Sequence, residues 1–79
     1  MKGAIDKDVF LEGVSRILEI PSMNIEDDCH AAPMWGSLAC FALKLWFKRE
    51  YGADVPFAEI DASRSAGELM ETVKCRQTS

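Results

Sequence analysis

The sequence contains no long run of apolar residues, and its first residues do not resemble an export signal. No apolar segment approaches the roughly 18–20 residues that a helix needs to cross a bilayer. The segment from Met1 to Asp6 carries charges where a signal peptide has its apolar stretch. We therefore expect a cytoplasmic protein without a membrane span.

Cysteine and histidine are few, and their spacing fits no common metal or redox motif. The three cysteines are Cys29, Cys40 and Cys75, an odd number without a C-x-x-C pair. The single histidine, His30, follows Cys29 but has no second pair of ligands nearby. We expect three reduced thiols that pack as small apolar side chains, as in cytoplasmic proteins, and no metal site.

The chain is too short for a large enzyme and too acidic for a general nucleic-acid binder. Its 79 residues form one small domain and cannot hold a doubly wound sheet, an α/β barrel or two lobes. Apolar residues make up 48%, which is typical of a globular chain rather than a disordered one. Nine Lys and Arg against thirteen Asp and Glu give a net charge of −4, whereas nucleic-acid binders normally present a basic face.

Apolar spacing and capping residues predict helices, and no segment alternates as a strand does. Asp6 is the expected N-cap of a first helix with one apolar face, and Pro21 ends the apolar pattern of this helix. Gly52 is placed to end the second helix, and Ser65 begins a capping box with Glu68. We expect an all-α single domain over residues 1–79, a bundle of three main helices and one short helix, with helices at about 7–19, 37–51, 57–61 and 65–74 and a loop at 20–36.

The segment 37–51 is apolar around much of its circumference, which indicates a central helix packed on more than one side. The loop before it is long for so small a domain, and such loops tend to carry function. We expect Ile25 and Met34 to point inward and hold this loop. The expected core contains eight large apolar side chains: Phe10, Ile17, Phe41, Leu45, Phe47, Ile60, Leu69 and Val73.

Three short motifs stand in a distinctive order and spacing: Ile17-Leu18-Glu19-Ile20-Pro21, Trp35-Gly36-Ser37-Leu38 and Val55-Pro56. From about residue 9 to residue 73 the chain thus resembles the acyl carrier proteins, the phosphopantetheine-binding carriers of fatty-acid, polyketide and peptide synthesis, and the resemblance implies an acyl-carrier-like bundle. It is most similar to stand-alone bacterial carriers that have Trp-Asp-Ser-Leu at the attachment site. The distance from Ser37 to the Val-Pro step also matches the spacing of that family.

The resemblance implies that Ser37 carries a 4′-phosphopantetheine arm, with Gly36 and Leu38 flanking the attachment site. A helix N-terminus suits the resulting phosphodiester, because its free N–H groups and its dipole favour an anion. The arm would hold an acyl group as a thioester, and the carrier, not itself an enzyme, would present that group to partners. The implied partners of this monomer are a phosphopantetheinyl transferase and acyl-activating, acyl-transfer or condensing enzymes of a specialised lipid, polyketide or related pathway.

Two features depart from the family pattern. Gly36 stands where the family usually has Asp or another polar residue, which helps the transferase engage the serine. The following helix carries Lys44, Lys48 and Arg49. In typical fatty-acid carriers, which the chain otherwise resembles, the corresponding helix is an acidic recognition helix that basic partner surfaces bind. Like charges that face each other across an interface suppress binding of the wrong partner. We therefore expect this carrier to work poorly with housekeeping fatty-acid enzymes and to serve a dedicated set of partner enzymes. The expected partner contacts are Met34, Trp35, Lys44, Lys48 and Arg49.

Other functions stay open at this point. The chain could be an unmodified interaction module with the carrier fold, which Gly36 favours, or a carrier of aminoacyl or peptidyl groups. An unrelated helical domain such as a helix-turn-helix lacks support, because no basic recognition helix is present. A serine hydrolase is set aside, because Gly36-Ser37 lacks the G-x-S-x-G elbow and one histidine in so short a chain does not readily build a triad with its pocket.

Overall fold

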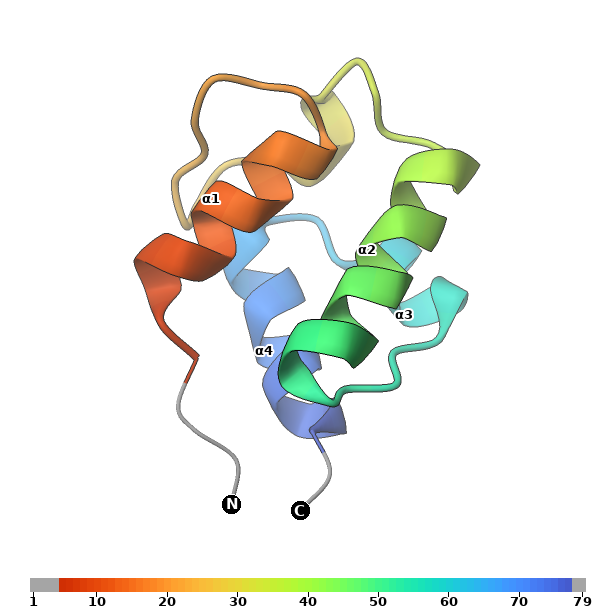
Figure 1. Cartoon of the computed structure of the whole chain (residues 1–79). Helices are drawn as coiled ribbons and strands as arrows, with labels where there is room; N and C mark the ends of the chain where they lie inside the picture. The colour runs from red at the N-terminus through yellow and green to blue at the C-terminus, as the bar shows by residue number, and fades with distance from the viewer. Residues whose placement is uncertain (1–4, 78–79) are drawn as a thin grey trace.

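The computed structural model describes residues 5–77, which form four α-helices and one short 3₁₀ helix (Figure 1). In chain order the elements are α1 (Lys7–Ile17), η1 (Cys29–Ala31), α2 (Ser37–Tyr51), α3 (Phe57–Ala62) and α4 (Ala66–Arg76). The described range contains two isolated β-bridges and no strand. The predicted all-α bundle is therefore confirmed. None of the described helices is long and apolar enough to cross a membrane.

The first helix begins where the sequence predicts and ends two residues earlier. Asp6 caps it, since its Oδ1 accepts hydrogen bonds from the N–H groups two and three residues further on, at 2.9 and 3.2 Å. The chain then turns through Glu19 in the left-handed region (φ 57°), and the N–H of Ile20 donates to the carbonyl of Ser15 at 2.9 Å. The end expected near residue 19 is wrong, because this capping turn occupies the residues before Pro21.

The other helix boundaries lie within two residues of those expected. α2 ends at Gly52 in the left-handed conformation (φ 63°), as predicted. Ser65 caps α4, because its hydroxyl accepts from the N–H of Glu68 at 3.1 Å. The Glu68 carboxylate in turn accepts from the N–H of Arg64, one residue before the cap. α4 runs two residues further than expected, and α3 runs one residue further.

The core draws on all four α-helices and on the long loop. Phe10 of α1 stacks on Phe47 of α2 with ring centroids 5.7 Å apart, and both rings are fully buried. Burial of a side chain of this size contributes about 1.5–3 kcal/mol. Five of the eight expected core residues are fully buried: Phe10, Phe47, Ile60, Leu69 and Val73.

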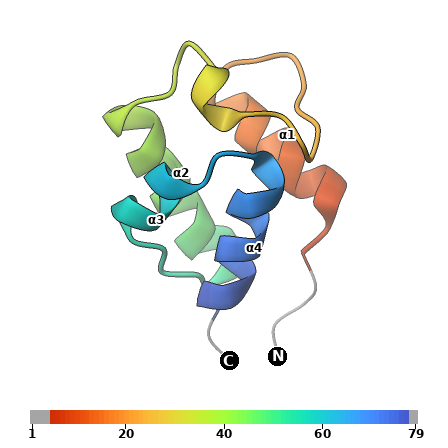
Figure 2. The same cartoon turned by 180° about the vertical axis from the view of Figure 1, so that it is seen from behind.

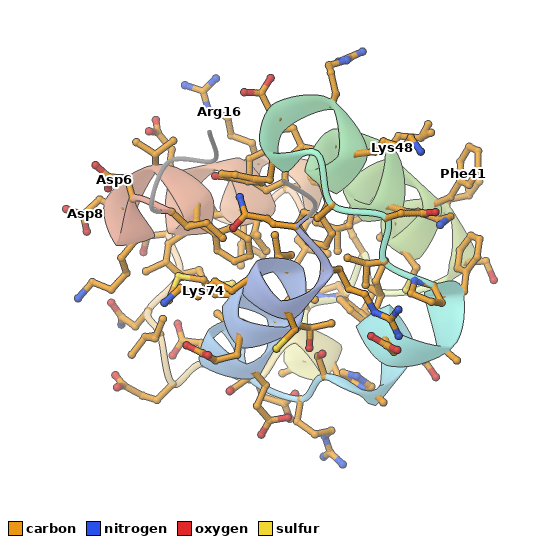
Figure 3. The ribbon with its side chains drawn as sticks, turned by 90° about the horizontal axis from the view of Figure 1, so that it is seen from below. Asp6, Asp8, Arg16, Phe41, Lys48 and Lys74 are labelled. Atoms are coloured by element: carbon orange, nitrogen blue, oxygen red, sulfur yellow. The ribbon has the colours of Figure 1, made fainter. Side chains whose placement is uncertain are left out.

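Three expected core residues are not fully buried. Phe41 is 48% exposed, Leu45 is 54% exposed, and Ile17 is half-buried. For Phe41 and Leu45 the reason is that α2 buries the face with Leu43 and Phe47, whereas its apolar side chains occur on all sides. Figure 3 shows Phe41 projecting away from the ribbon. α2 packs against both α1 and α3, in agreement with the prediction of more than one packed side, but the side with Phe41 and Leu45 stays exposed.

The loop between α1 and α2 is held by the start of α4. Figure 2 shows α4 lying between α1 on one side and α2 and α3 on the other. Ile25 is half-buried against the core, as expected, whereas Met34 is exposed and Met23 is buried instead. Three backbone hydrogen bonds of 2.7–3.0 Å join the loop to the start of α4: Gly67 N–H to Ile25 O, Ala66 N–H to Asp27 O, and Cys29 N–H to Arg64 O.

Candidate functional site

Ser37 is the first residue of α2, and its side chain is exposed. The first hydrogen bond of this helix runs from the N–H of Cys40 to the carbonyl of Gly36 at 2.9 Å, so the N–H groups of residues 37–39 precede the helical pattern. Gly36 has no side chain with which to cap them. An anion on the Ser37 hydroxyl would therefore lie where these N–H groups and the helix dipole stabilise negative charge.

Gly36 leaves open space immediately before Ser37. Its backbone is extended (φ 170°, ψ −169°), which is a conformation that any residue adopts. A Cβ placed on Gly36 would meet no atom within 4 Å. The absence of a side chain at this position therefore has no steric cause within this chain.

The loop before Ser37 is anchored through Trp35. Its indole stacks on the ring of His30 with centroids 4.7 Å apart, and the backbone N–H of Trp35 donates to the carbonyl of Ala32 at 3.0 Å. Nε2 of His30 lies 3.1 Å from the carbonyl of Ser63, in the turn before α4. The expected partner contact Trp35 is thus half-buried in a stack that fixes the backbone two residues before Ser37.

An apolar hollow of about 360 Å³ opens beside Ser37, between the end of α1 and the first turns of α2. Met34 and Leu38, both exposed, lie at this hollow. No charged side chain lines it, so the surroundings of the Ser37 hydroxyl favour apolar groups in a bound molecule. The residues that line it are Ile17, Met34, Gly36, Ser37, Leu38, Ala39 and Ala42.

The three cations expected as partner contacts are of two kinds. The Nζ of Lys44, which is half-buried, donates to Oδ1 of Asp54 at 3.1 Å and to the carbonyl of Val55 at 3.0 Å. The hydrogen bond and charge of Lys44, with a smaller contribution from Lys48, lower the pKa of the Asp54 carboxyl. Lys48 and Arg49 are exposed and form no ion pair with a carboxylate among residues 5–77. Lys44 therefore holds the segment before α3, whereas Lys48 and Arg49 face solvent.

The cysteines do not contribute a nucleophile to the site. Cys29 and Cys40 are buried and Cys75 is exposed, and all three are free thiols. Burial, with the nearby charge of Asp28, raises the pKa of Cys29 to about 11, and burial also raises the pKa of Cys40. Both buried thiols are therefore protonated at neutral pH and react slowly. Within the described range, no group of three or more His, Cys, Asp or Glu side chains is placed to hold a metal ion.

Phe57 is a surface residue next to α2 that no sequence pattern connects with the candidate site. It lies at the start of α3 and stacks on Phe41 with ring centroids 6.1 Å apart and 10° between the ring planes. Both rings are about half exposed. The two residues come from different helices, and no periodicity in the sequence relates them.

Comparison of the chain with protein-family models, with curated proteins and with solved structures finds no match. The resemblance to acyl carriers therefore rests on the motifs and spacing of the sequence.

Proposed function

We propose that the protein is an acyl carrier, which holds an acyl group as a thioester on a 4′-phosphopantetheine arm attached to Ser37. The observation that carries this proposal is the exposed Ser37 side chain at the first residue of a 15-residue helix, at the end of an anchored loop. The motif at residues 35–38, which resembles the attachment site of acyl carriers, falls on this position. In this proposal the chain acts as a cytoplasmic monomer and performs no catalysis itself.

Attachment is a phosphoryl transfer from coenzyme A. Oγ of Ser37 attacks the phosphorus that bears the pantetheine, an Oγ–P bond forms, and the P–O bond to 3′,5′-ADP breaks. The hydroxyl proton passes to a base of the phosphopantetheinyl transferase. The product is a phosphodiester anion, which the N–H groups at the start of α2 stabilise. The open space at Gly36 leaves Oγ accessible to the transferase.

The surroundings of Ser37 fit the chemistry of the arm. When bound, the arm supplies a thiol that holds the acyl group as a thioester. Gly36 and Leu38 flank the attachment point, and the hollow lined by Met34 and Leu38 accepts uncharged, partly apolar groups. Acyl-activating, acyl-transfer or condensing enzymes of a specialised lipid, polyketide or related pathway then act on the presented group.

A modification assay tests this proposal. The protein is incubated with coenzyme A and a broad-range phosphopantetheinyl transferase, and its intact mass is measured. Wild type should gain one phosphopantetheine, Ser37→Ala should gain none, and Ser22→Ala, which alters an exposed serine of the preceding loop, should behave as wild type. The proposal fails if several transferases leave wild type unmodified or if Ser37→Ala gains the same adduct.

Gly36 favours one second candidate, an unmodified interaction module with the carrier fold. The reason is that the chain has glycine where acyl carriers usually have a polar side chain that helps the transferase. The intact mass of protein purified from its native host separates the two candidates. An unmodified mass supports the interaction module. An adduct supports the carrier, and the mass of its load distinguishes an acyl carrier from a carrier of aminoacyl or peptidyl groups.

A further inference from the structure

The segment that leads into α2 is anchored at a single position. Of residues 33–38, five are exposed and Trp35 alone is half-buried. Side-chain caps close the first turns of α1 and α4, whereas Gly36 supplies no such cap to α2. The hydrogen bond that begins α2, from the N–H of Cys40 to the carbonyl of Gly36 at 2.9 Å, therefore depends on how Trp35 holds the preceding backbone.

The ring of His30 links Trp35 to the turn before α4. It stacks on the indole with 23° between the ring planes, and its Nε2 lies 3.1 Å from the carbonyl of Ser63. Because a carbonyl oxygen only accepts, Nε2 carries the hydrogen of this bond. Ser63 is itself buried, and its Oγ donates to the carbonyl of Glu59 at 2.9 Å. His30 thus connects a fixed turn to the backbone two residues before Ser37.

The backbone around His30 is held independently of Trp35. The N–H of His30 donates to Oδ1 of Asp28 at 2.9 Å, and the N–H of Cys29 donates to the carbonyl of Arg64 at 2.7 Å. The Asp28 carboxylate also pairs with the Arg64 guanidinium at 3.7 Å. These contacts fix the position of His30 against the start of α4, so its ring supports the indole and does not merely follow it.

We infer that His30 is a positioning residue for the attachment of phosphopantetheine to Ser37 and that it acts through Trp35. This inference rests on the proposed function, because it concerns the same transfer to Ser37. The imidazole keeps the first turn of α2 closed, so that the N–H groups of residues 37–39 stay where the phosphodiester anion forms. Loss of this support should act on kcat, because the reacting groups are displaced while the exposed surface that the transferase binds is unchanged.

Four variants of the full chain test this role with a broad-range transferase and coenzyme A. His30→Ala removes both contacts, His30→Phe keeps a ring for Trp35, and His30→Gln keeps a donor for Ser63 but no ring. Gln77→Ala is the matched control, because it removes a side-chain donor to the carbonyl of Tyr51, a 3.3 Å hydrogen bond at the other end of α2. Rates are measured below the melting temperature of each variant and over a range of carrier concentrations, which gives kcat and KM separately.

The ring of His30 should matter for kcat and not for KM. His30→Ala should lower kcat about tenfold or more and leave KM within about twofold of wild type. His30→Phe should restore kcat to within about threefold of wild type, His30→Gln should stay as slow as His30→Ala, and Gln77→Ala should keep both constants. The inference is overturned if His30→Ala keeps the wild-type kcat or changes only KM. It is equally overturned if His30→Phe is no faster than His30→Gln, or if Gln77→Ala is as slow as His30→Ala.

Amide hydrogen exchange of the unmodified chain separates this inference from the proposed function. In His30→Ala the N–H of Cys40 should exchange at least about tenfold faster, and the N–H of Phe47, in the buried part of the same helix, reports the stability of the whole fold as a reference. Unchanged exchange at Cys40, or equal modification of wild type and His30→Ala, would keep the carrier and remove the positioning role. If no transferase modifies wild type, the carrier proposal is wrong and the role of His30 in attachment is overturned with it, whatever the exchange at Cys40.

Discussion

Trp46 of α2 lies directly against Gly13 of α1: a Cβ at position 13 would stand 2.2 Å from Cζ2 of the indole. The ring is held from other sides as well, since it packs edge-on against Tyr51 at 5.4 Å and tilted against Phe10 at 5.7 Å. Gly13 lies within α1 in ordinary helical conformation. Its glycine therefore serves the close approach of two helices and not an unusual backbone angle.

Gly13→Ala should lower the free energy of unfolding by about 1–3 kcal/mol, the usual cost of an overpacked contact. The helix propensity of alanine opposes this loss by no more than about 1 kcal/mol. Urea denaturation measures the change. Gly36→Ala is the control for steric contact, because no atom lies within 4 Å of its added Cβ; it should cost no more than about 1 kcal/mol, since alanine is a poorer N-cap than glycine. A Gly13→Ala variant about 1 kcal/mol more stable than wild type would show the full gain in helix propensity, and hence that Trp46 moves away without cost.

Glu19→Gly should raise the free energy of unfolding by about 1 kcal/mol, because a residue with a Cβ is strained in the left-handed conformation that ends α1. Glu19→Ala removes the same carboxylate but keeps the Cβ, so it should leave stability close to that of wild type. Equal gains from both variants would assign the effect to charge and not to the backbone. Thermal and urea unfolding of the three proteins make the comparison.

Phe47→Ala should lower the free energy of unfolding by about 3–5 kcal/mol, because the ring is fully buried and stacked on Phe10. Phe41→Ala removes the same side chain from the surface and should cost about 1 kcal/mol, the worth of its stack on Phe57. The two variants form a matched pair on one helix. A loss at Phe41 as large as that at Phe47 would show that the outer face of α2 is part of the core.

The helices were predictable from the sequence because their ends depend on local chemistry. Asp6 and Ser65 cap through their own side chains, and Gly52 adopts the left-handed conformation that stops α2. The end of α1 was placed too late, since Pro21 marks only the last residue at which the helix must have stopped. The backbone pairing of the long loop with the start of α4 joins segments about 40 residues apart, and no local pattern encodes it.

The candidate site was predictable in part. The position of Ser37 at the start of α2 follows from the break between the loop and the apolar helix. The burial of Phe41 and Leu45 was wrongly predicted, because an all-round apolar helix does not reveal which side its neighbours cover. Lys44 is paired with Asp54 whereas Lys48 faces solvent, and this difference depends on where the chain passes after α2. The spacing of residues along the helix does not specify that path.

The contact between Lys44 and Asp54 should stabilise the fold in a pH-dependent way. The folded state lowers the pKa of Asp54 from its ordinary value of 3.8, so the stabilisation is present above that value and is lost as the pH falls through the lowered pKa. Asp54→Asn should therefore be less stable than wild type at neutral pH and equal to it in strong acid. Asp61→Asn, an exposed carboxylate without an ion pair in the described range, is the control and should change little. A difference between wild type and Asp54→Asn that persists unchanged in acid would contradict this account.

Gly36→Asp should change modification and leave the fold nearly untouched. The added side chain meets open space and can accept a hydrogen bond from an N–H in the first turn of α2, which improves on a glycine cap by only a few tenths of a kcal/mol. A carboxylate beside Ser37 also gives a cationic side chain of the transferase an acceptor with which to pair.

A broad-range transferase should therefore modify Gly36→Asp faster than wild type, with almost the same melting temperature. Gly36→Asn separates the two effects, because it caps the helix as well as Asp does but carries no charge. We expect its rate to stay near that of wild type. If Asn accelerates modification as much as Asp, the cap and not the charge is responsible. If neither variant is faster, Gly36 is present because a dedicated transferase or partner approaches the backbone closely, and a side chain at this position obstructs it.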